Sequence, residues 1–448
     1  MSLFGSLFSG VSGLSAQSRS MSMISDNVAN VNTTAYKGAE AQFASLVTRQ
    51  PSSATYSPGG VRSFSSYSIG SQGLIQSSAS PTDAAISGSG FFVVNSEATG
   101  GGEQLYTRAG SFSTDYLGNL RTTSGQYLQG WALDADEQIV DINSLETVNI
   151  RIINGLAAAT TTVQIGANLN ADQTAHAGAY AAGDMAAYNA SGGTSGVQPQ
   201  FFRDVQVYDT LGRPQNVTMA FIKDPAANTW QVEIYAPTGS VETAQHPNGL
   251  LATGTVTFGG DGSLASTSLT PAYPAGAVAG DPIGVDWLDL DGAEDSAVTF
   301  DFGSIGSTDG LTQFASDTSV AYVTQNGAEV GELNGVSLDE DGYVIASFTN
   351  GEERKLYRLP IATFANPSAL DPRSGNIYAQ TDSSGEFNLR FSGSGGAGTV
   401  TPSALEAANV DLADEFTKMI VTQRAYSANA RIITTTDEML NELISISR

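Results

Sequence analysis

Residues that could carry out chemistry are scarce in this chain of 448 amino acids. It has no cysteine, which excludes disulfides, thiolate zinc sites and cysteine nucleophiles together. His176 and His246 are its two histidines, so the side chain that most often serves as general base or metal ligand is nearly missing. Acidic residues are plentiful, but no spacing marks two of them as the carboxylate pair of a glycosidase. The sequence therefore predicts no catalytic, metal or cofactor site, and a protein that is not an enzyme.

The densest group of possible metal ligands is an acidic cluster made of Asp286, Asp289, Asp291, Glu294 and Asp295. Its spacing does not fit a calcium loop, because placing Gly292 at the sixth position puts Trp287 first and Val298 twelfth. We therefore interpret the cluster as a solvated acidic loop.

Two further patterns have a structural and a functional interpretation. Gly88-Ser89-Gly90 precedes an apolar run and lacks the third glycine of a dinucleotide loop, so it favours a turn into a strand. Trp131, Trp230 and Trp287 could line a glycan groove, but scattered tryptophans are more often core residues.

The charge of the chain is strongly negative and uneven. The net charge is −26, which argues against binding nucleic acid. Residues 1–50 hold three basic and two acidic residues, and residues 405–448 hold four basic and seven acidic residues. Nearly all of the excess negative charge therefore lies between these two ranges. The chain has no run of about 18 apolar residues, so no transmembrane helix is predicted. The first positive charge is Arg19, so we expect no cleaved signal peptide.

Both ends of the chain carry apolar residues at heptad spacing. The N-terminal set is Leu7, Leu14, Met21 and Val28, with Leu3, Ile24 and Val31 at interleaved positions. The C-terminal set is Leu405, Leu412, Met419, Tyr426, Ile433 and Leu440, with Phe416, Ala430 and Ile444 as companions. This spacing predicts coiled-coil helices. Because isolated helices are marginal in water, we expect them to pair with each other, with other copies, or both; a hairpin packed on the chain's own core is the alternative.

The middle of the chain has the pattern of short strands and tight turns. The spacing Asp-x-x-Gly predicts turns at Asp115/Gly118, Asp209/Gly212, Asp339/Gly342 and Asp382/Gly385, and Asn350-Gly351 marks another. Strands are predicted at 91–95, 205–208, 217–222, 230–235 and 343–348. Stretches rich in Gly, Ala and Ser at 171–196 and 392–398 predict loops or linkers.

Several strings of residues resemble the axial proteins of the bacterial flagellum, which build its rod and hook. They are ISDNVANVNTTAYK at 24–37, DAAISGSGFFVV at 83–94, YTRAGSFSTDYLGNLRTTSGQYLQGW at 106–131, ATFANPSALDPRSGNIYAQT within 359–387, and NVDLADEFTKMIVTQRAYSANARII at 409–433. The family motif residues among them are Asn27, Asn30, Asn32, Asn409, Asp411, Gln423 and Arg424. The segment QVYDTLGRPQNVTMAF at 206–221 and the long middle of the chain are similar to the hook branch of this family rather than to a rod component.

The resemblance implies an α+β fold with nested domains: 1–38 with 401–448 as an inner helical coiled-coil domain, 39–71 as an extended connector, 72–155 with 320–400 as a middle β domain, and 156–319 as an outer β domain. It implies a structural subunit, exported without a cleaved signal peptide, whose copies form a curved, hollow, flexible tube outside the cell. Such a tube works as a universal joint between motor and filament. The implied partners are other copies, the distal rod, the hook–filament junction proteins, the hook cap and the export apparatus. The rival interpretations are a rod component and an extracellular glycan-binding or hydrolytic β protein.

Overall fold

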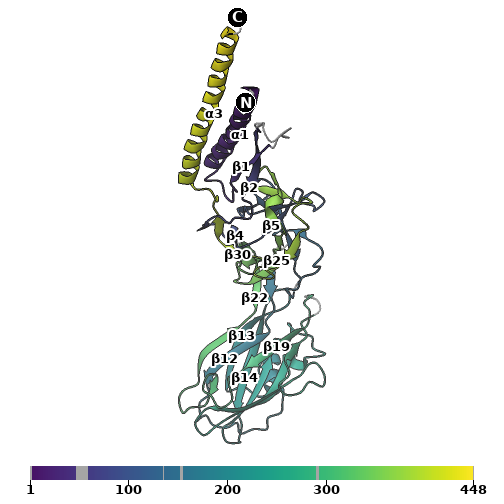
Figure 1. The fold of residues 1–448 in the computed structure, drawn as a ribbon. Coiled ribbons are helices and arrows are strands. Elements are labelled where there is room, and N and C mark those ends of the chain that lie inside the picture. The colour runs from purple at the N-terminus through teal and green to yellow at the C-terminus, as the bar shows by residue number, and fades with distance from the viewer. Residues whose placement is uncertain (1–2, 47–58, 135, 152–154, 289–291, 447–448) are drawn as a thin grey trace. The chain divides into compact units, whose positions relative to one another are not determined.

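A computed structural model describes residues 3–46, 59–134, 136–151, 155–288 and 292–446. The chain divides into two compact units. Unit 1 comprises residues 1–152, 335–347 and 353–448, and unit 2 comprises residues 153–334 and 348–352. The described chain is mainly β, with one long helix near each end (Figure 1). The finer division into inner, connector, middle and outer segments stays a prediction.

The two long helices of unit 1 are α1 (Leu3–Ala29) and α3 (Leu412–Ile446), and they lie side by side with opposite chain directions (Figure 1). Helix α3 begins where Asp411 caps it: its Oδ1 accepts the backbone N–H groups of Ala413 at 2.7 Å and Asp414 at 3.3 Å. Asp414 and Glu415 then place negative charge in the first turn, where the helix dipole favours it. No helix among the described residues is long and apolar enough to span a membrane.

The rest of unit 1 is a 13-stranded sheet with three strand pairs. The main path of the sheet is β23 (Leu333–Leu338), β24 (Tyr343–Phe348), β25 (Glu353–Arg358), β9 (Tyr127–Ala132), β5 (Phe91–Asn95), β6 (Gln104–Thr107), β28 (Ile377–Ala379) and β27 (Asp371–Arg373). Its side members are β7 (Phe112–Thr114), β8 (Leu120–Thr122), β10 (Glu146–Thr147), β26 (Ile361–Thr363) and β29 (Asn388–Arg390), and a 3-10 turn η3 covers Pro367–Ala369. The pairs are β1 (Ala39–Ser45) with β2 (Val61–Tyr67), β3 (Ile75–Ser77) with β31 (Ala404–Glu406), and β4 (Ala84–Ser87) with β30 (Thr399–Pro402).

Unit 2 is built from two five-stranded sheets whose inner faces share one apolar core. The antiparallel sheet runs β13 (Phe201–Tyr208), β14 (Pro214–Lys223), β15 (Thr229–Tyr235), β16 (Leu250–Phe258) and β17 (Leu264–Pro271). The mixed sheet contains β18 (Ile283–Val285), β19 (Ser296–Asp301), β12 (Thr162–Asn168), β20 (Leu311–Thr312) and β21 (Ser319–Gln325). The pair β11 (Leu156–Ala158) with β22 (Ala328–Gly331), the short helix α2 (Asp184–Ala190) and a 3-10 turn η1 (Pro247–Gly249) complete the unit. Two sheets that pack face to face make this unit a sandwich.

The three tryptophans are core residues, as their scatter predicted. Trp131, Trp230 and Trp287 are each at most 2% exposed. The indole N–H of Trp230 donates to Gln313 at 3.0 Å, and that of Trp287 donates to Ser296 at 2.8 Å. A buried indole needs a hydrogen-bond acceptor for its N–H group, and these bonds supply one for Trp230 and one for Trp287. None of the three lines a glycan groove.

Most of the local predictions are confirmed. The glycine N–H bonds back to the aspartate carbonyl in the turns at Asp115/Gly118, Asp209/Gly212 and Asp339/Gly342, and Gly351 closes a turn on Phe348. The predicted strands coincide with β5 and β24 or fall within β13, β14 and β15. In the fourth Asp-x-x-Gly segment the turn starts one residue earlier, because Ser384 donates to the carbonyl of Thr381. A second bond, from the Thr381 N–H to the Ser384 hydroxyl at 3.0 Å, supports that earlier register.

Three local predictions are wrong. Leu405 is not helical: it lies in β31, where it pairs with Gln76, because Ser403 takes a positive φ of 49° and turns the chain into a strand. Val31 lies in the turn after α1, which ends at Ala29. The stretch 171–196 is not only loop, because it contains α2, whose Met185 and Ala186 are buried. The other stretch, 392–398, is the loop between β29 and β30. Of the acidic cluster, residues 289–291 lie outside the described residues.

Candidate assembly surface and its anchor

The contact between α1 and α3, which we call the seam, is lined by small and polar residues. On α1 the buried row is Gly10, Gly13, Ala16, Ser20, Ile24 and Asn27. On α3 the buried row is Glu415, Thr422 and Thr436, with Asn429 half-buried between them at the same spacing of seven. Asn27 donates to Glu415 at one end of the seam, and Gly13 lies against Asn429 further along. These two pairs show that the helices are antiparallel.

Two glycines of α1 leave room for side chains of α3 in the seam. A Cβ built on Gly13 would lie 2.8 Å from the side-chain amide of Asn429, and one on Gly10 would lie 3.1 Å from the Ile433 side chain. Ala16, which is 3% exposed, has the smallest side chain that still fills such a contact. The small residues therefore permit close approach of the two helices, and the seam leaves little room for the predicted leucine row.

Most of the predicted heptad residues border the seam; Ile24 belongs to its buried row, and the Ile433 side chain lies against Gly10. Leu7, Leu14, Met21, Val28, Met419, Ile433 and Leu440 are half-buried, while Ile24 is buried. Others are still more open, with exposed fractions of 41% for Leu412, 51% for Phe416, 45% for Tyr426 and 62% for Ile444. The residues of α3 that face α1 are polar, and a search for apolar residues at heptad spacing could not find them. They are Glu415, Thr422, Asn429 and Thr436. A search for polar residues of any type at a spacing of seven would have found them.

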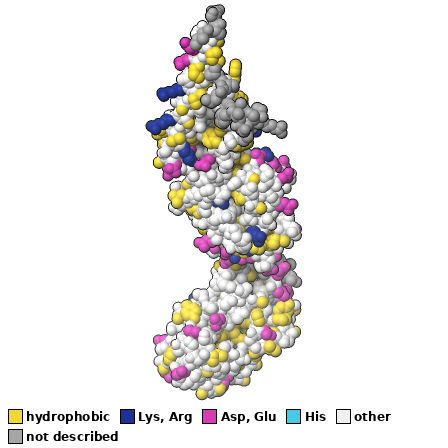
Figure 2. Space-filling view, in the orientation of Figure 1, with side chains coloured by type: hydrophobic (Ala, Val, Ile, Leu, Met, Phe, Trp, Pro, Cys, Tyr) yellow, Lys and Arg dark blue, Asp and Glu magenta, His cyan; other side chains and the backbone are white. Residues whose placement is uncertain are grey.

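A second apolar row lies on α3 beside the seam, and we call it the outer stripe. It consists of Val421, Ile432, Met439 and Leu443, with exposed fractions of 44% to 61%. Its spacing of 11, 7 and 4 residues keeps all four side chains on one face of an α-helix. Helix α1 adds Phe4, Phe8 and Val11, which are 75%, 56% and 48% exposed. Figure 2 shows hydrophobic side chains on the surface of the helical pair, next to basic side chains.

A groove of about 320 Å³ opens where α1, β1 and α3 meet. Met23 and Ile24 of α1, Phe43 of β1 and Val421 of α3 contribute apolar surface to it, and Lys418 stands among them. The Lys418 ammonium donates to Glu40 at 2.6 Å and to Glu415 at 2.9 Å. Partial burial lowers the pKa of Lys418, but the bonds to the two carboxylates outweigh it and leave the pKa raised. The groove joins the outer stripe to the exposed face of β1.

The polar end of the seam is held by Asn27, a family motif residue that is 2% exposed. Its side-chain N–H₂ donates to the carbonyl of Ala39 at 2.9 Å and to Glu415 at 3.1 Å. Its oxygen accepts the N–H of Ala39 at 2.9 Å and the hydroxyl of Tyr36 at 3.2 Å. The one amide therefore joins α1, the start of β1 and α3.

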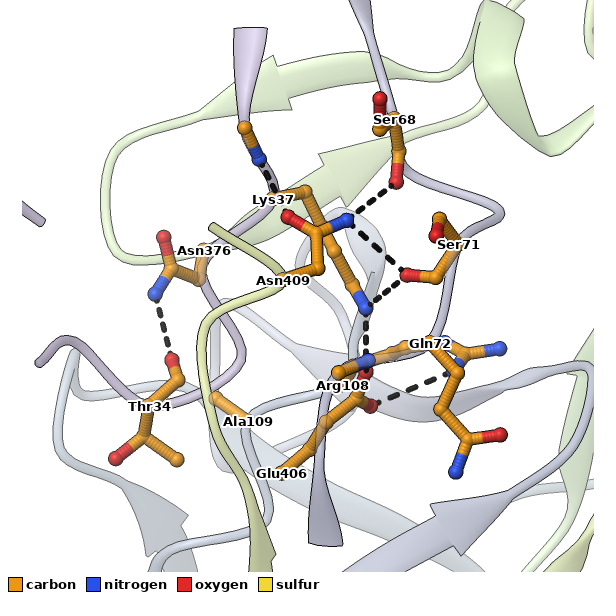
Figure 3. Close-up of polar contacts among 12 residues, drawn as sticks. Thr34, Lys37, Ser68, Ser71, Gln72, Arg108, Ala109, Asn376, Glu406 and Asn409 are labelled. Atoms are coloured by element: carbon orange, nitrogen blue, oxygen red, sulfur yellow. Dashed lines mark hydrogen bonds and ion pairs between the residues drawn. The ribbon is translucent and has the colours of Figure 1, made fainter. Parts of the chain in front are cut away.

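A second polar cluster, the anchor, is centred on Glu406 at the end of β31 (Figure 3). The Lys37 ammonium donates to Glu406 and, at 2.6 Å, to the Ser71 carbonyl. The Arg108 guanidinium lies 3.4 Å from the other Glu406 oxygen. Both cations and the carboxylate are at most 4% exposed. Burial lowers the pKa of Lys37 and outweighs the opposing effect of Glu406, so this lysine sits in a strongly desolvated place.

Asn409 belongs to the same anchor. Its oxygen accepts the N–H of Gly38 at 2.8 Å, and its N–H₂ donates to the carbonyls of Ser68 at 3.1 Å and Ser71 at 3.3 Å (Figure 3). Together with Glu406 it fastens the chain leaving α1, the chain after β2 and the chain entering α3. The anchor thus fixes the place where both helices leave the β structure.

The remaining motif residues have simpler positions. Asn30 donates to the Asp26 carbonyl at 2.9 Å and accepts from the Thr33 hydroxyl, which closes the C-terminal end of α1. Asp411 caps α3, as described above. Asn32, Gln423 and Arg424 are exposed, and Gln423 and Tyr426 line a shallow hollow beside α1. Lys37 and Arg108 lie within the family-like strings at 24–37 and 106–131, and Glu406 lies outside them. The sequence assigned none of the three a role, since a buried ion cluster depends on contacts between distant segments.

Comparison with protein families places four flagellar models along the chain. The flagella basal body rod protein model matches residues 7–37, and the flagellar hook protein FlgE/F/G D1 domain model matches residues 85–168. The flagellar basal body protein FlaE D2 domain model matches residues 198–328, and the flagellar basal body rod FlgEFG protein C-terminal model matches residues 401–446.

Curated relatives match over their whole length. The flagellar hook protein FlgE of Caulobacter vibrioides is 32% identical over 100% of both chains, and that of Rhizobium meliloti is 33% identical over 100% of both. A crystal structure of the Helicobacter pylori flagellar hook protein FlgE2 is 14% identical, covers 74% of this chain and 100% of its own, and has a TM-score of 0.42.

Proposed function

The chain belongs to the flagellar hook protein family and is a structural subunit of the flagellar hook; from this premise we propose that its copies polymerise through α1 and α3. A contact between unlike surfaces that does not close into a ring generates a helical filament. The product is a curved, hollow tube outside the cell that passes motor torque to the filament. The role is structural rather than catalytic.

The observation that carries this proposal is the apolar surface that the seam leaves uncovered. The outer stripe and the exposed Phe4, Phe8 and Val11 lie on two helices whose mutual contact is polar and small. Contiguous exposed apolar surface on a soluble protein marks a site of association. A coiled-coil arrangement with the helices of neighbouring copies would bury these residues.

The size of the effect favours a polymer over a simple pair. Burying a Val, Leu, Ile or Met side chain contributes about 1.5–3 kcal/mol, so the four half-exposed residues of the outer stripe contribute roughly 3–6 kcal/mol. Association costs about 4–15 kcal/mol in lost translational and rotational freedom. The two ranges overlap only between about 4 and 6 kcal/mol, so one stripe gives at most weak association, and stable assembly needs contacts with several neighbours. A helical lattice supplies them.

The partition of charge suggests how such a tube bends. Nearly all of the negative charge lies in residues 51–404, between the two helical ends. Polar, hydrated contacts exchange easily, whereas apolar helix contacts do not. We infer that the helices provide continuity while contacts made by the β structure slide. From the family likeness we further propose that the tube joins the distal rod, the junction proteins and the hook cap, and that its subunits leave through the export apparatus without a cleaved signal peptide.

The test places charge in the outer stripe. In the full-length chain, Ile432→Asp with Met439→Asp should abolish tube formation, because it buries unpaired carboxylates in the subunit contact. Negative-stain microscopy and sedimentation under salting-out conditions measure polymer, and circular dichroism of the β structure checks folding.

A matched control carries the same charges on another face of the same helix. Thr434 and Asn441 are exposed and lie away from the outer stripe. Thr434→Asp with Asn441→Asp should form tubes at nearly the normal concentration. Normal tubes from the Ile432/Met439 variant, or equal loss in both variants, would contradict the proposal.

A further inference from the structure

Unit 2 contains a pocket of about 300 Å³ between α2 and the outer face of the antiparallel sheet. The side chains of Tyr188, Asn189, Gln198, Phe202, Asp204 and Tyr235 line it. The segment 171–196 that the sequence marked as loop supplies one wall of it. The assembly role of the terminal helices makes no use of this place.

The floor of the pocket is one row of residues across three strands. Asp204 of β13 is the register partner of Thr218 in β14, and Thr218 is the partner of Tyr235 in β15. The Thr218 hydroxyl donates to the Asp204 carboxylate at 2.7 Å, which orients that carboxylate. Phe202 stands two residues before Asp204 on the same face and is 57% exposed. A carboxylate and two aromatic rings therefore share a small area of sheet.

The wall formed by α2 is firmly fixed. The buried carboxylate of Glu233 accepts the N–H of Gly183 at 2.8 Å, the N–H of Ala186 at 2.8 Å and the hydroxyl of Tyr180 at 2.6 Å. Met185 packs with Ala186 against apolar residues of the sheet. A buried carboxylate that accepts three such bonds is costly to disturb, so the pocket is formed before any ligand arrives.

The loop after α2 completes the wall. Gly192 and Gly193 both have positive φ, at 63° and 87°, which lets the chain turn back at once. A Cβ on Gly193 would lie 3.3 Å from the ring of Tyr188. The tight turn therefore backs the aromatic ring that lines the pocket.

The lining residues indicate the class of ligand. Among the described residues that line the pocket there is no Lys, Arg or His, which disfavours phosphate or another anion. Aromatic faces carry a negative quadrupole that attracts the C–H face of a sugar ring, and amide and carboxylate groups bond its hydroxyls. The pocket volume is at the lower end for small-molecule sites, which suits one or two sugar rings. We propose that this pocket binds a short, uncharged saccharide.

The test uses the full-length chain below its polymerisation concentration. The probes are the methyl glycosides of glucose, galactose, mannose and N-acetylglucosamine, each measured by saturation-transfer NMR and titrated to 20 mM, roughly the weak end of single-pocket affinities. We expect transfer to the C–H face of at least one probe. Phe202→Ala should weaken binding of that probe about tenfold, because it removes the exposed ring.

The matched control is Phe314→Ala, which removes another exposed phenylalanine of unit 2, 45% exposed, outside the pocket. It should bind the probe like the unaltered chain, and circular dichroism should show both variants folded. No transfer to any of the four probes, or equal binding by the Phe202 and Phe314 variants, overturns the proposal. If no probe binds and Phe202→Ala weakens tube formation, the pocket is a contact between copies instead.

Discussion

Asn27 and Glu415 are 388 positions apart, and the 3.1 Å bond between them joins the last turns of α1 to the first turn of α3. Both side chains are nearly or fully buried. The bond sits at the end of the seam from which the chain enters β1, so the two terminal helices and the β structure meet at one amide.

Asn27→Ala should loosen this end of the seam. It removes the side-chain partner of the Ala39 N–H and carbonyl groups and of one Glu415 oxygen, while Lys418 still bonds the other Glu415 oxygen. Each buried group left without a partner costs about 1–3 kcal/mol. Hydrogen exchange at the Ala39 amide should accelerate at least tenfold. Asn32→Ala, an exposed motif position, should leave it unchanged. Equal exchange in both variants would show that Asn27 does not hold the junction.

Glu406→Gln should destabilise unit 1 and leave unit 2 intact. It leaves the buried Lys37 and Arg108 without their anion, and removing one partner of a buried ion pair costs about 3–5 kcal/mol. Hydrogen-exchange mass spectrometry of peptides from each unit, measured at increasing urea concentrations, reports the stabilities of unit 1 and unit 2 separately. The control is Glu137→Gln, which breaks the exposed pair with Lys355 and should leave the urea dependence of unit 1 nearly unchanged, because solvent screens this pair. The anchor is unimportant if both variants behave alike.

The pH dependence of unit 2 should show a loss of stability in alkali. Burial, with nearby Asp204 and Glu233, raises the pKa of Tyr235 from 10.0 to about 12. Between pH 10 and 12 the unfolded chain releases this proton and the folded chain keeps it. The free energy of unfolding therefore falls as pH rises through this window, by about 1.4 kcal/mol per pH unit for each such proton. Urea unfolding followed by tryptophan fluorescence measures the slope.

Tyr235→Phe identifies the residue responsible. Between pH 10 and 12 the free energy of unfolding should fall less steeply with pH, by the contribution of one proton. At pH 8 the free energy of unfolding should be nearly unchanged. Tyr116→Phe makes the same chemical change at a side chain that is 85% exposed and should keep the full slope. A slope in the Tyr235 variant that equals that of the unaltered chain would assign the alkaline loss elsewhere.

Gly13→Leu should impair polymerisation by forcing the helices apart. Its side chain would collide with Asn429, which lies 2.8 Å from the Cβ position. Ser15→Leu adds the same side chain on the exposed face of α1 and serves as control. We expect the critical concentration for tubes to rise at least tenfold for the first variant only. If the critical concentration rose for Ser15→Leu but not for Gly13→Leu, the seam would tolerate a larger separation of α1 and α3.

Features that depend on a few neighbouring residues could be predicted from the amino-acid sequence alone. The turn at Asp115/Gly118 forms because an aspartate carbonyl and a glycine N–H three residues apart can meet, whatever surrounds them. The strands β5 and β24 follow from runs of apolar and β-branched residues between such turns. The strings around Asn27 and Asn409 pointed to the family for the same reason, since they are continuous in the chain.

Which faces of the helices are covered depends on contacts between distant segments of the fold. The heptad spacing of Met419 and Leu440 was visible in the sequence, but the residues buried against α1 are Thr422 and Thr436, because small residues on α1 let the backbones approach. Leu405 continued the spacing and became a strand, because β3, more than 300 positions earlier, offered its backbone a partner. Lys37 and Glu406 likewise become an ion pair only in the fold. Side-chain burial, strand pairing and ion pairing depend on contacts between segments that are far apart in the chain, so no local pattern encodes them.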